Sequence, residues 1–172
     1  TPLEVVTEQY RRLRDYNDRI TWALAPSIPQ LCSTELLQGM GELSEAEGLQ
    51  IFTHNCDGKS FTLPDRTRYA DHDGSSVKYL HDIGLLGPRM GLVHSIWVRQ
   101  DEIDLMAETG AHVNLIPAGN LKTKSGVPPF RGYLEAGVSI GLGTDNSSNG
   151  DAQNMFHVKK FFAGLAAVCD PD

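Results

Sequence analysis

The sequence predicts an α/β fold built on a parallel sheet. Four or five short apolar runs, ending near residues 25, 54, 94, 117 and 144, alternate with helix-like segments, and each interval fits one βα unit. The runs are continuously apolar, which is typical of strands covered on their faces by helices. The sheet is either open and doubly wound or part of a (β/α)8 barrel. A complete barrel needs roughly 250 residues, so a chain of 172 residues supplies only part of one.

The individual elements follow from apolar periodicity and from capping residues. The expected strands are 20–25, 49–54, 90–98, 111–117 and 138–143. The expected helices are 3–16, 35–48, 75–87, 99–110, 130–137 and 151–168. Ser33 or Thr34 is a good N-cap for the second helix, and Gly48 can end it. Residues 55–74 follow no regular pattern, and residues 118–129 are expected to form a loop.

Composition and charge exclude several classes of protein. The net charge is -7 and no basic stripe occurs, so neither nucleic acid nor an anionic membrane surface is an expected partner. No apolar run reaches the ~18 residues of a membrane span, and no signal-peptide pattern opens the chain. Three scattered cysteines argue against a disulfide framework and favour a reducing, cytoplasmic location.

Residues of metal-binding type stand where several expected strands end. His54 ends the second strand, His94 lies within the third, and Asp145 follows the fifth. The carboxyl ends of parallel strands form the active face of α/β folds, so these side chains can converge. Imidazole and carboxylate groups suit zinc or iron. At this point structural roles stay open for the histidines, and a turn-capping role stays open for Asp145.

Four segments carry a resemblance to a known family. They are "ALAPSIPQLCSTELL", "IFTHNCD", "GLVHSIWVRQDEIDLMAETGAHVNLIPAGNLKTKSG" and "FRGYLEAGVSIGLGTDNSSNG". In these segments and their order, the chain resembles the chlorohydrolase and aminohydrolase branch of the amidohydrolase superfamily, which includes triazine hydrolases and S-adenosylhomocysteine, guanine and cytosine deaminases. The resemblance implies a (β/α)8 barrel with one divalent metal ion, of which this chain covers roughly strands 4 to 8. Residues 1–172 would form the C-terminal part of one metal-dependent hydrolase barrel.

The resemblance also implies roles for individual residues. His54 matches the fifth-strand metal ligand, and Asp145 matches the eighth-strand ligand, which also takes a proton from water. His94 matches the sixth-strand histidine, which in this branch contacts the hydroxide or the substrate, and it is an alternative metal ligand. Asp57 stands three residues after His54, where the family often has a proton-carrying glutamate. The family's first-strand His-x-His pair does not occur in these 172 residues, so an earlier part of the full protein is expected to supply it.

The implied function is hydrolytic deamination or dechlorination of a small heterocyclic substrate. The expected cofactor is one divalent metal ion, with zinc favoured over iron, and the full-length protein is expected to form a homo-oligomer. Two other classes remain as alternatives. One is a catalytically inactive barrel that acts as a binding or scaffold protein. The other is an open α/β sheet that binds a nucleotide through the loop 141–150.

Overall fold

The computed structural model describes residues 2–150 and 152–169 and contains one five-stranded sheet. The strands are β1 (Ala23–Leu24), β2 (Gln50–Asn55), β3 (Met90–His94), β4 (His112–Leu115) and β5 (Ile140–Leu142). The helices before β3 are α1 (Leu3–Leu13), η1 (Pro29–Leu31), α2 (Thr34–Glu47), α3 (Lys59–Arg68), η2 (Ala70–His72) and α4 (Ser76–Asp82). Those after β3 are α5 (Gln100–Thr109), α6 (Pro117–Lys122), α7 (Phe130–Ala136), α8 (Ser147–Gly150) and α9 (Met155–Cys169). The predicted alternation of strands and helices is therefore confirmed.

The strand order is the same in space as along the chain. β1, β2, β3, β4 and β5 pair successively, and every described pair is parallel. A doubly wound sheet reverses its strand order at a switch point, whereas a (β/α)8 barrel adds each strand beside the previous one. Among the described strands the order never reverses, which is the arrangement of a partial barrel and not of an open nucleotide-binding sheet.

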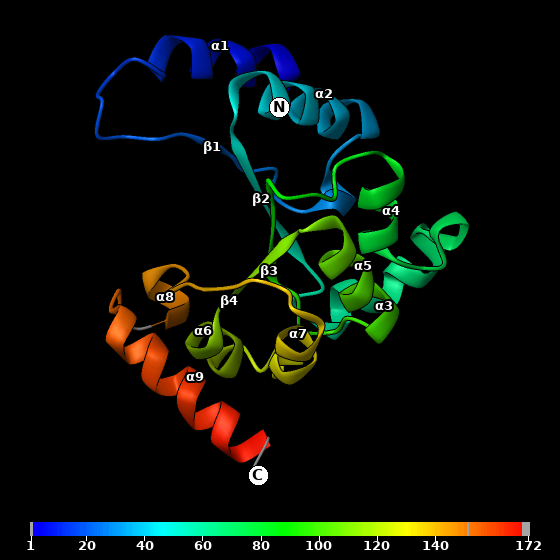
Figure 1. Ribbon diagram of the computed structural model, residues 1–172, viewed down its shortest axis with the longest axis vertical. Coiled ribbons are helices and arrows are strands. Elements are labelled where there is room, and N and C mark those ends of the chain that lie inside the picture. Colours follow the sequence, from blue (N-terminus) through cyan, green and yellow to red (C-terminus); the bar gives the residue numbers. More distant parts are fainter. Residues whose placement is uncertain (1, 151, 170–172) are drawn as a thin grey trace.

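The two faces of the sheet have different surroundings. Along β2, the side chains of Ile51, Thr53 and Asn55 are buried, while Phe52 is half-buried and His54 is exposed. Because successive side chains in a strand point to opposite faces, one face is covered and the other is open. Helices such as α4 and α5 lie on the covered side, and Figure 1 shows α1 and α9 at opposite ends of the molecule. The open face corresponds to the inside of a barrel.

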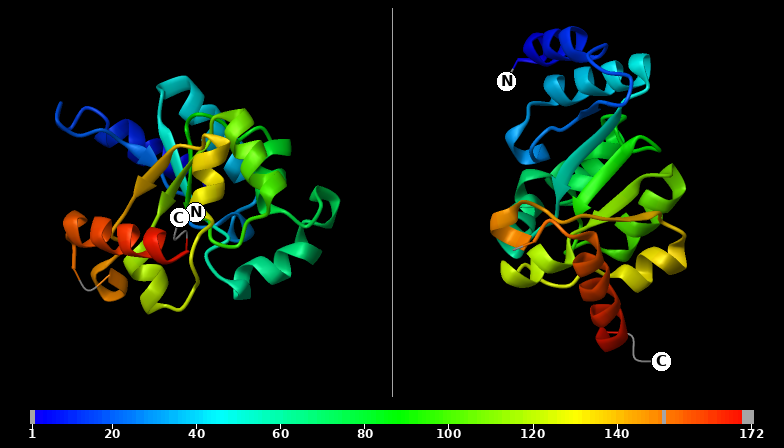
Figure 2. Two further views of the ribbon diagram at one scale, coloured as in Figure 1. Left: turned by 60° about the horizontal axis from the view of Figure 1, so that its bottom comes forward. Right: turned by 90° about the vertical axis from the view of Figure 1, so that its left-hand side faces the viewer.

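Capping residues fix the helix that leads into β2. The Ser33 hydroxyl accepts a hydrogen bond from the Leu36 backbone N–H at 3.2 Å, and Gly48 ends α2 in the left-handed region at a φ of 69°. Leu37 and Met40 of this helix are buried in the hydrophobic core. These contacts confirm the predicted bounds of the helix to within one residue. Figure 2 shows α1 and α2 together at one end of the sheet.

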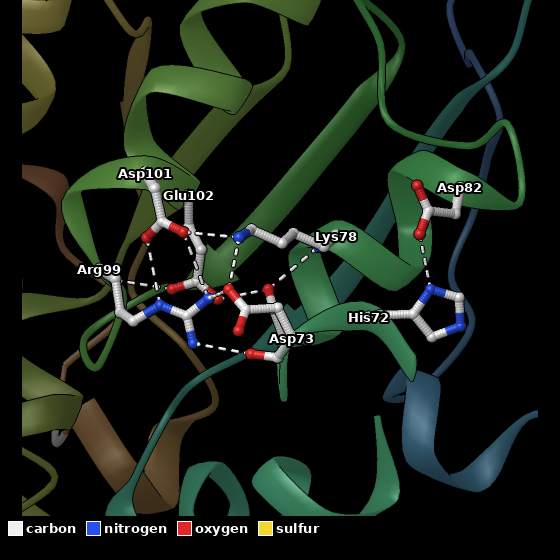
Figure 3. A network of polar contacts seen from close by, with 8 residues as sticks. His72, Asp73, Lys78, Asp82, Arg99, Asp101 and Glu102 are labelled. Atoms are coloured by element: carbon white, nitrogen blue, oxygen red, sulfur yellow. Dashed lines mark hydrogen bonds and ion pairs between the residues drawn. The ribbon is translucent and has the colours of Figure 1, made fainter. Parts of the chain in front are cut away.

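A polar network joins the N-terminal turns of α4 and α5 on the outer side (Figure 3). Buried Glu102 accepts hydrogen bonds from the Ser75 hydroxyl and, at 2.6 Å, from the Arg99 backbone N–H. Lys78 forms ion pairs with Asp73 and Asp101, each at 2.7 Å. The Glu102 carboxylate thus supports two helix starts at once, and it fixes how α4 and α5 pack beside β3.

Four described helices after β2 were not expected from the sequence, and the bounds of several elements differ from the prediction. α3 and η2 occupy the stretch 55–74, α6 begins at Pro117, and α8 follows the last strand. The third strand ends at His94 and not at residue 98, because His94 and Ser95 have φ values of 68° and 46°. The last helix begins at Met155; its predicted first residue, 151, lies outside the described residues.

No helix in the described part of the chain has both the length and the apolar character needed to cross a bilayer.

Candidate metal and catalytic site

His54 is held at the end of β2 by the segment that follows β1. Its ring Nδ1 lies 2.6 Å from the Ser27 carbonyl oxygen, and its backbone N–H donates to the same oxygen at 3.1 Å. Because a carbonyl oxygen only accepts, Nδ1 must carry the hydrogen, and Nε2 is left with its lone pair. Fixing of one ring nitrogen by a backbone carbonyl is typical of metal-binding histidines.

His94 reaches the open face of the sheet through a left-handed backbone. It pairs in register with Asn55, whose side chain points to the helix-covered face. A regular strand would direct His94 to that face as well. Its φ of 68° instead turns the side chain, and its ring stacks on that of His54 at a centroid distance of 5.3 Å and an interplanar angle of 21°. The turn therefore brings the two predicted histidines side by side.

Several contacts hold this unfavourable turn. The backbone N–H of Ser95 donates to the Asn55 carbonyl at 2.8 Å, and the Tyr133 hydroxyl donates to the Ser95 carbonyl. The Cys56 carbonyl accepts hydrogen bonds from the backbone N–H groups of Ile96 and Trp97, at 3.0 and 3.1 Å. Non-glycine residues in the left-handed region cost on the order of 1–3 kcal/mol each and persist where the surroundings determine them. Such strain often marks a functional site, and here it aims His94.

Asp145 lies directly after β5, at the same end of the sheet. Its Oδ1 accepts from the Asn146 backbone N–H at 2.7 Å, and its Oδ2 accepts from the Asn149 side-chain amide at 3.1 Å. A Cβ added to Gly119 at the start of α6 would stand 3.2 Å from Oδ2, so the carboxylate lies against that helix. Asn120, the next residue of α6, contacts the His94 ring. Asp145 and His94 thus flank the same short segment.

The predicted proton carrier, Asp57, lies two residues beyond β2 and is half-buried. Its Oδ1 is buried and has no hydrogen-bond partner. A carboxylate oxygen in this condition is costly unless a proton or an outside donor reaches it. The side chain is therefore not part of the hydrogen-bond network of the described residues, unlike most buried acids.

The neighbouring thiol is not a nucleophile in this arrangement. Cys56 is buried, and its Sγ lies 3.7 Å from the Ser76 hydroxyl. Burial, together with nearby Glu102, raises the pKa of the Cys56 thiol to about 12. Since the thiolate is the reactive form, the thiol stays protonated near neutral pH. A nucleophilic pair of Cys56 with His54 therefore has no support in this environment.

The structure brings some predicted site residues together and leaves others apart. The rings of His54 and His94 stack on each other, and the Gly119–Asn120 segment of α6 lies between His94 and Asp145. No described contact joins Asp57 to either histidine. Within the described ranges, no group of three or more His, Cys, Asp or Glu side chains is arranged to hold a metal ion. Zinc normally takes three or four protein ligands. The donor types present suit a divalent ion, but they form part of a ligand set and not a complete one.

Two residues that hold the histidines could not be identified from the sequence. Ser27 acts through its backbone carbonyl, which every residue possesses, so no sequence signal marks it. Asn120 contacts His94 through its side chain, and its position just after the fourth strand was the only available signal. The other histidines lie elsewhere; His72, for example, pairs with Asp82 at 2.6 Å on the outer surface.

The successive parallel strands, the open inner face and the polar residues at the carboxyl end are the features of part of a (β/α)8 barrel. The chain belongs to the amidohydrolase family, whose sequence profile matches residues 2–168. The five strands form part of the barrel of this family, in agreement with the predicted strands 4 to 8.

Similar proteins of known name include deaminases. The chain is 35% identical over 152 residues to a 5'-deoxyadenosine deaminase of Methanothermobacter thermautotrophicus, covering 88% of this chain and 35% of that protein. It is 34% identical over 149 residues to a 5-methylthioadenosine/S-adenosylhomocysteine deaminase of Nitratidesulfovibrio vulgaris, covering 85% of this chain and 33% of the relative. The chain thus spans only about a third of the length of these relatives.

A solved structure gives the same result. An adenosine deaminase from Xanthomonas campestris with bound zinc superposes with a TM-score of 0.88 at 25% identity, covering 96% of this chain and 37% of that one. The family and its fold are therefore established for this chain.

Proposed function

We propose that the protein containing this chain is a metal-dependent hydrolase that removes the amino group from an adenosine-type nucleoside. The observation that carries this proposal is the His54–His94 pair at adjacent strand ends. Both Nδ1 atoms are hydrogen-bonded, and neither Nε2 has a hydrogen-bond partner among the described residues. The names of the relatives add the substrate class, since those that match over most of this chain are adenosine-type deaminases. The reaction would consume one water and release ammonia.

The residues present fit a divalent ion as part of its ligand set. His54 Nε2 and an Asp145 oxygen would bind it, and His94 is the alternative ligand. Zinc suits this mixture of imidazole and carboxylate, and iron is the alternative. When bound, such an ion lowers the pKa of a water ligand toward neutrality. The remaining ligands would come from the part of the barrel outside this chain, as the first-strand pair of the family implies.

Each side chain of this chain then has a distinct task. Asp145 accepts the proton of the attacking water, and its two existing hydrogen bonds keep the carboxylate oriented. His94 presents the lone pair of Nε2 to the attacking water, which donates a hydrogen bond to it. Asp57, with its unpaired Oδ1, carries a proton to the ring nitrogen or to the leaving amino group. General acid and base groups of this kind contribute roughly 10²–10⁴-fold each.

Dechlorination is the neighbouring reaction to be distinguished. An atrazine chlorohydrolase from Arthrobacter aurescens superposes with a TM-score of 0.79, but at 23% identity this likeness concerns the fold alone. Asp57 is one methylene shorter than the glutamate that the family often has, so its proton reaches less far. This difference supports a substrate whose basic nitrogen lies close to the end of β2.

The decisive experiment uses the protein expressed from its whole coding sequence. Metal content is measured by elemental analysis, and turnover of 5'-deoxyadenosine, 5-methylthioadenosine and atrazine is followed by release of ammonia or chloride. We expect ammonia from the nucleosides, loss of turnover with a chelator, and recovery with zinc. Asp145→Ala should abolish turnover and weaken metal binding.

Other results would overturn the proposal. An Asp145→Ala protein that keeps both metal and turnover would exclude the assigned role. A metal-free protein without turnover on any of these compounds would favour the binding or scaffold alternative. The single-domain assignment of residues 1–172 within one barrel, the homo-oligomeric state of the full-length protein and its cytoplasmic location are part of the proposal, and light scattering and cell fractionation test the last two.

A further inference from the structure

A buried amide beside His94 has a contact that the fold itself does not require. The Asn120 side chain is 1% exposed, and its Oδ1 lies 2.9 Å from His94 Nδ1. The backbone of Asn120 is already anchored on both sides, by a bond from its N–H to the Ile116 carbonyl and by one from the Ser125 N–H to its own carbonyl, each at 2.9 Å. The turn around Asn120 therefore closes without help from the side chain.

The other end of the same amide is unpaired. Asn120 Nδ2 is buried and has no hydrogen-bond partner within the described residues. A buried amide that serves only the fold is expected to have both of its ends satisfied, because each unpaired group is costly. Among the described residues, His94 is therefore the hydrogen-bond partner of the Asn120 side chain, and this contact distinguishes Asn120 from other buried amides.

The chemistry of the contact determines the state of the ring. An amide oxygen only accepts hydrogen bonds, so the imidazole nitrogen facing it carries the hydrogen. His94 is then the Nδ1–H tautomer, with a lone pair at Nε2. The Ser27 carbonyl imposes the same tautomer on His54. The two stacked rings thus both have an acceptor nitrogen at Nε2. The Asn120 amide fixes this tautomer of His94 without the negative charge that a carboxylate would place beside the ring.

We propose that Asn120 is a positioning residue that fixes the tautomer and orientation of His94. In this assignment the side chain acts through the histidine, which it contacts. The assignment concerns His94 in its role under the proposed function and so rests on that function. Gly119 next to it keeps α6 close to Asp145, so one short segment sets the positions of two candidate catalytic groups.

The test compares two variants of nearly equal volume in the whole protein. Asn120→Leu removes the acceptor oxygen, while Asn120→Asp retains one. Long-range proton–nitrogen NMR correlations of ¹⁵N-histidine-labelled protein report the tautomer directly, without substrate. We expect Nδ1–H for His94 in the parent protein and in Asn120→Asp, and loss of that tautomer in Asn120→Leu. Asn120→Ala provides the same readout if the leucine variant does not fold.

A matched control removes a comparable amide elsewhere. Asn114 on β4 also has a buried, unpaired Nδ2, and Asn114→Ala should leave the His94 tautomer as it is. In kinetics, Asn120→Leu should lower kcat by about 10–100-fold, as is usual for residues that support a first ligand shell. KM should change by no more than about twofold, because the assigned role places Asn120 behind the histidine.

The outcomes separate this proposal from the proposed function. Retention of the Nδ1–H tautomer in both the leucine and alanine variants would overturn the role of Asn120, whatever reaction the protein catalyses. Loss of the tautomer with an unchanged kcat would overturn it as well. Failure to find a deaminase substrate would leave the NMR comparison fully readable, so that result would count against the proposed function alone.

Discussion

The hydroxyl of Tyr133 offers a direct test of how the strained turn at His94 is held. Tyr133 lies on α7, is fully buried and donates to the Ser95 carbonyl. Tyr133→Phe removes this bond and keeps the ring, so the packing of the core is retained. Burial raises the pKa of the Tyr133 hydroxyl above its ordinary range, so the group stays a donor near neutral pH.

The expected cost follows from the burial of the acceptor. Ser95 is 0% exposed, so no bulk water replaces the lost donor. A buried carbonyl left without a partner costs about 1–3 kcal/mol. Part of this loss destabilises the left-handed turn that orients His94, because the lost bond helps to hold that turn. Since about 1.4 kcal/mol corresponds to tenfold in rate, kcat should fall by about 3–10-fold.

Tyr79→Phe is the matched control. Tyr79 is 8% exposed, and its hydroxyl lies 2.9 Å from the Thr34 hydroxyl, on the covered side of the sheet. Its loss should cost about 0.5–1.5 kcal/mol, since the partner is a half-buried hydroxyl that can rotate to water. Urea unfolding gives the free energies, and the His94 ring signals in the NMR spectrum show whether the ring has moved. Only Tyr133→Phe should shift those signals and lower kcat.

The reasoning would be refuted by equal effects of the two variants on His94 and on turnover. It would also be refuted if Tyr133→Phe were as stable as the parent protein, because the Ser95 carbonyl would then have another partner.

Three further predictions concern stability. Glu102→Gln should cost about 1–3 kcal/mol, because an amide cannot accept both of the bonds that join α4 to α5, whereas exposed Glu108→Gln should stay within about 0.5 kcal/mol in the same urea titration. Burial lowers the pKa of His112. The neutral imidazole therefore contributes its full stability above the unfolded-state pKa of about 6.5, and this stability is lost as pH falls toward the lower pKa of the folded state. His112→Gln should reduce the fall of the urea midpoint over this pH range. Gly126→Ala should lower the thermal midpoint, since its φ is 127° and a Cβ would stand 3.1 Å from the Trp97 ring; an unchanged midpoint would show that the loop can adjust.

The strand and helix pattern was predictable because it depends on local apolar periodicity. The caps of α2 are an example: Ser33 and Gly48 are strong local signals, and both have the predicted roles. α3 was not predictable, because it is weakly amphipathic and contains Pro64. α6 begins at Pro117, which reads equally well as the end of a strand, since proline suits the first turn of a helix.

The site was predictable in part for a topological reason. Parallel strands bring their carboxyl ends to one edge, so His54 and His94 could be expected to lie near each other. The side of the sheet toward which His94 points depends on its φ of 68°, which no residue pattern in the sequence predicts. The Ser27 carbonyl and the Asn120 amide lie 27 and 26 residues away from the histidines that they hold. Contacts of this kind depend on how distant turns meet in three dimensions.

The successive order of the strands has a consequence for how such a protein can change over generations. Each strand is followed by its own segment at the carboxyl end, and neighbouring strands are held in register by backbone bonds that no loop contributes. A segment such as α3 can therefore be lengthened, shortened or exchanged without shifting the strand beside it. New substrate preferences can arise one unit at a time, while the stacked imidazoles that the strands carry keep their place.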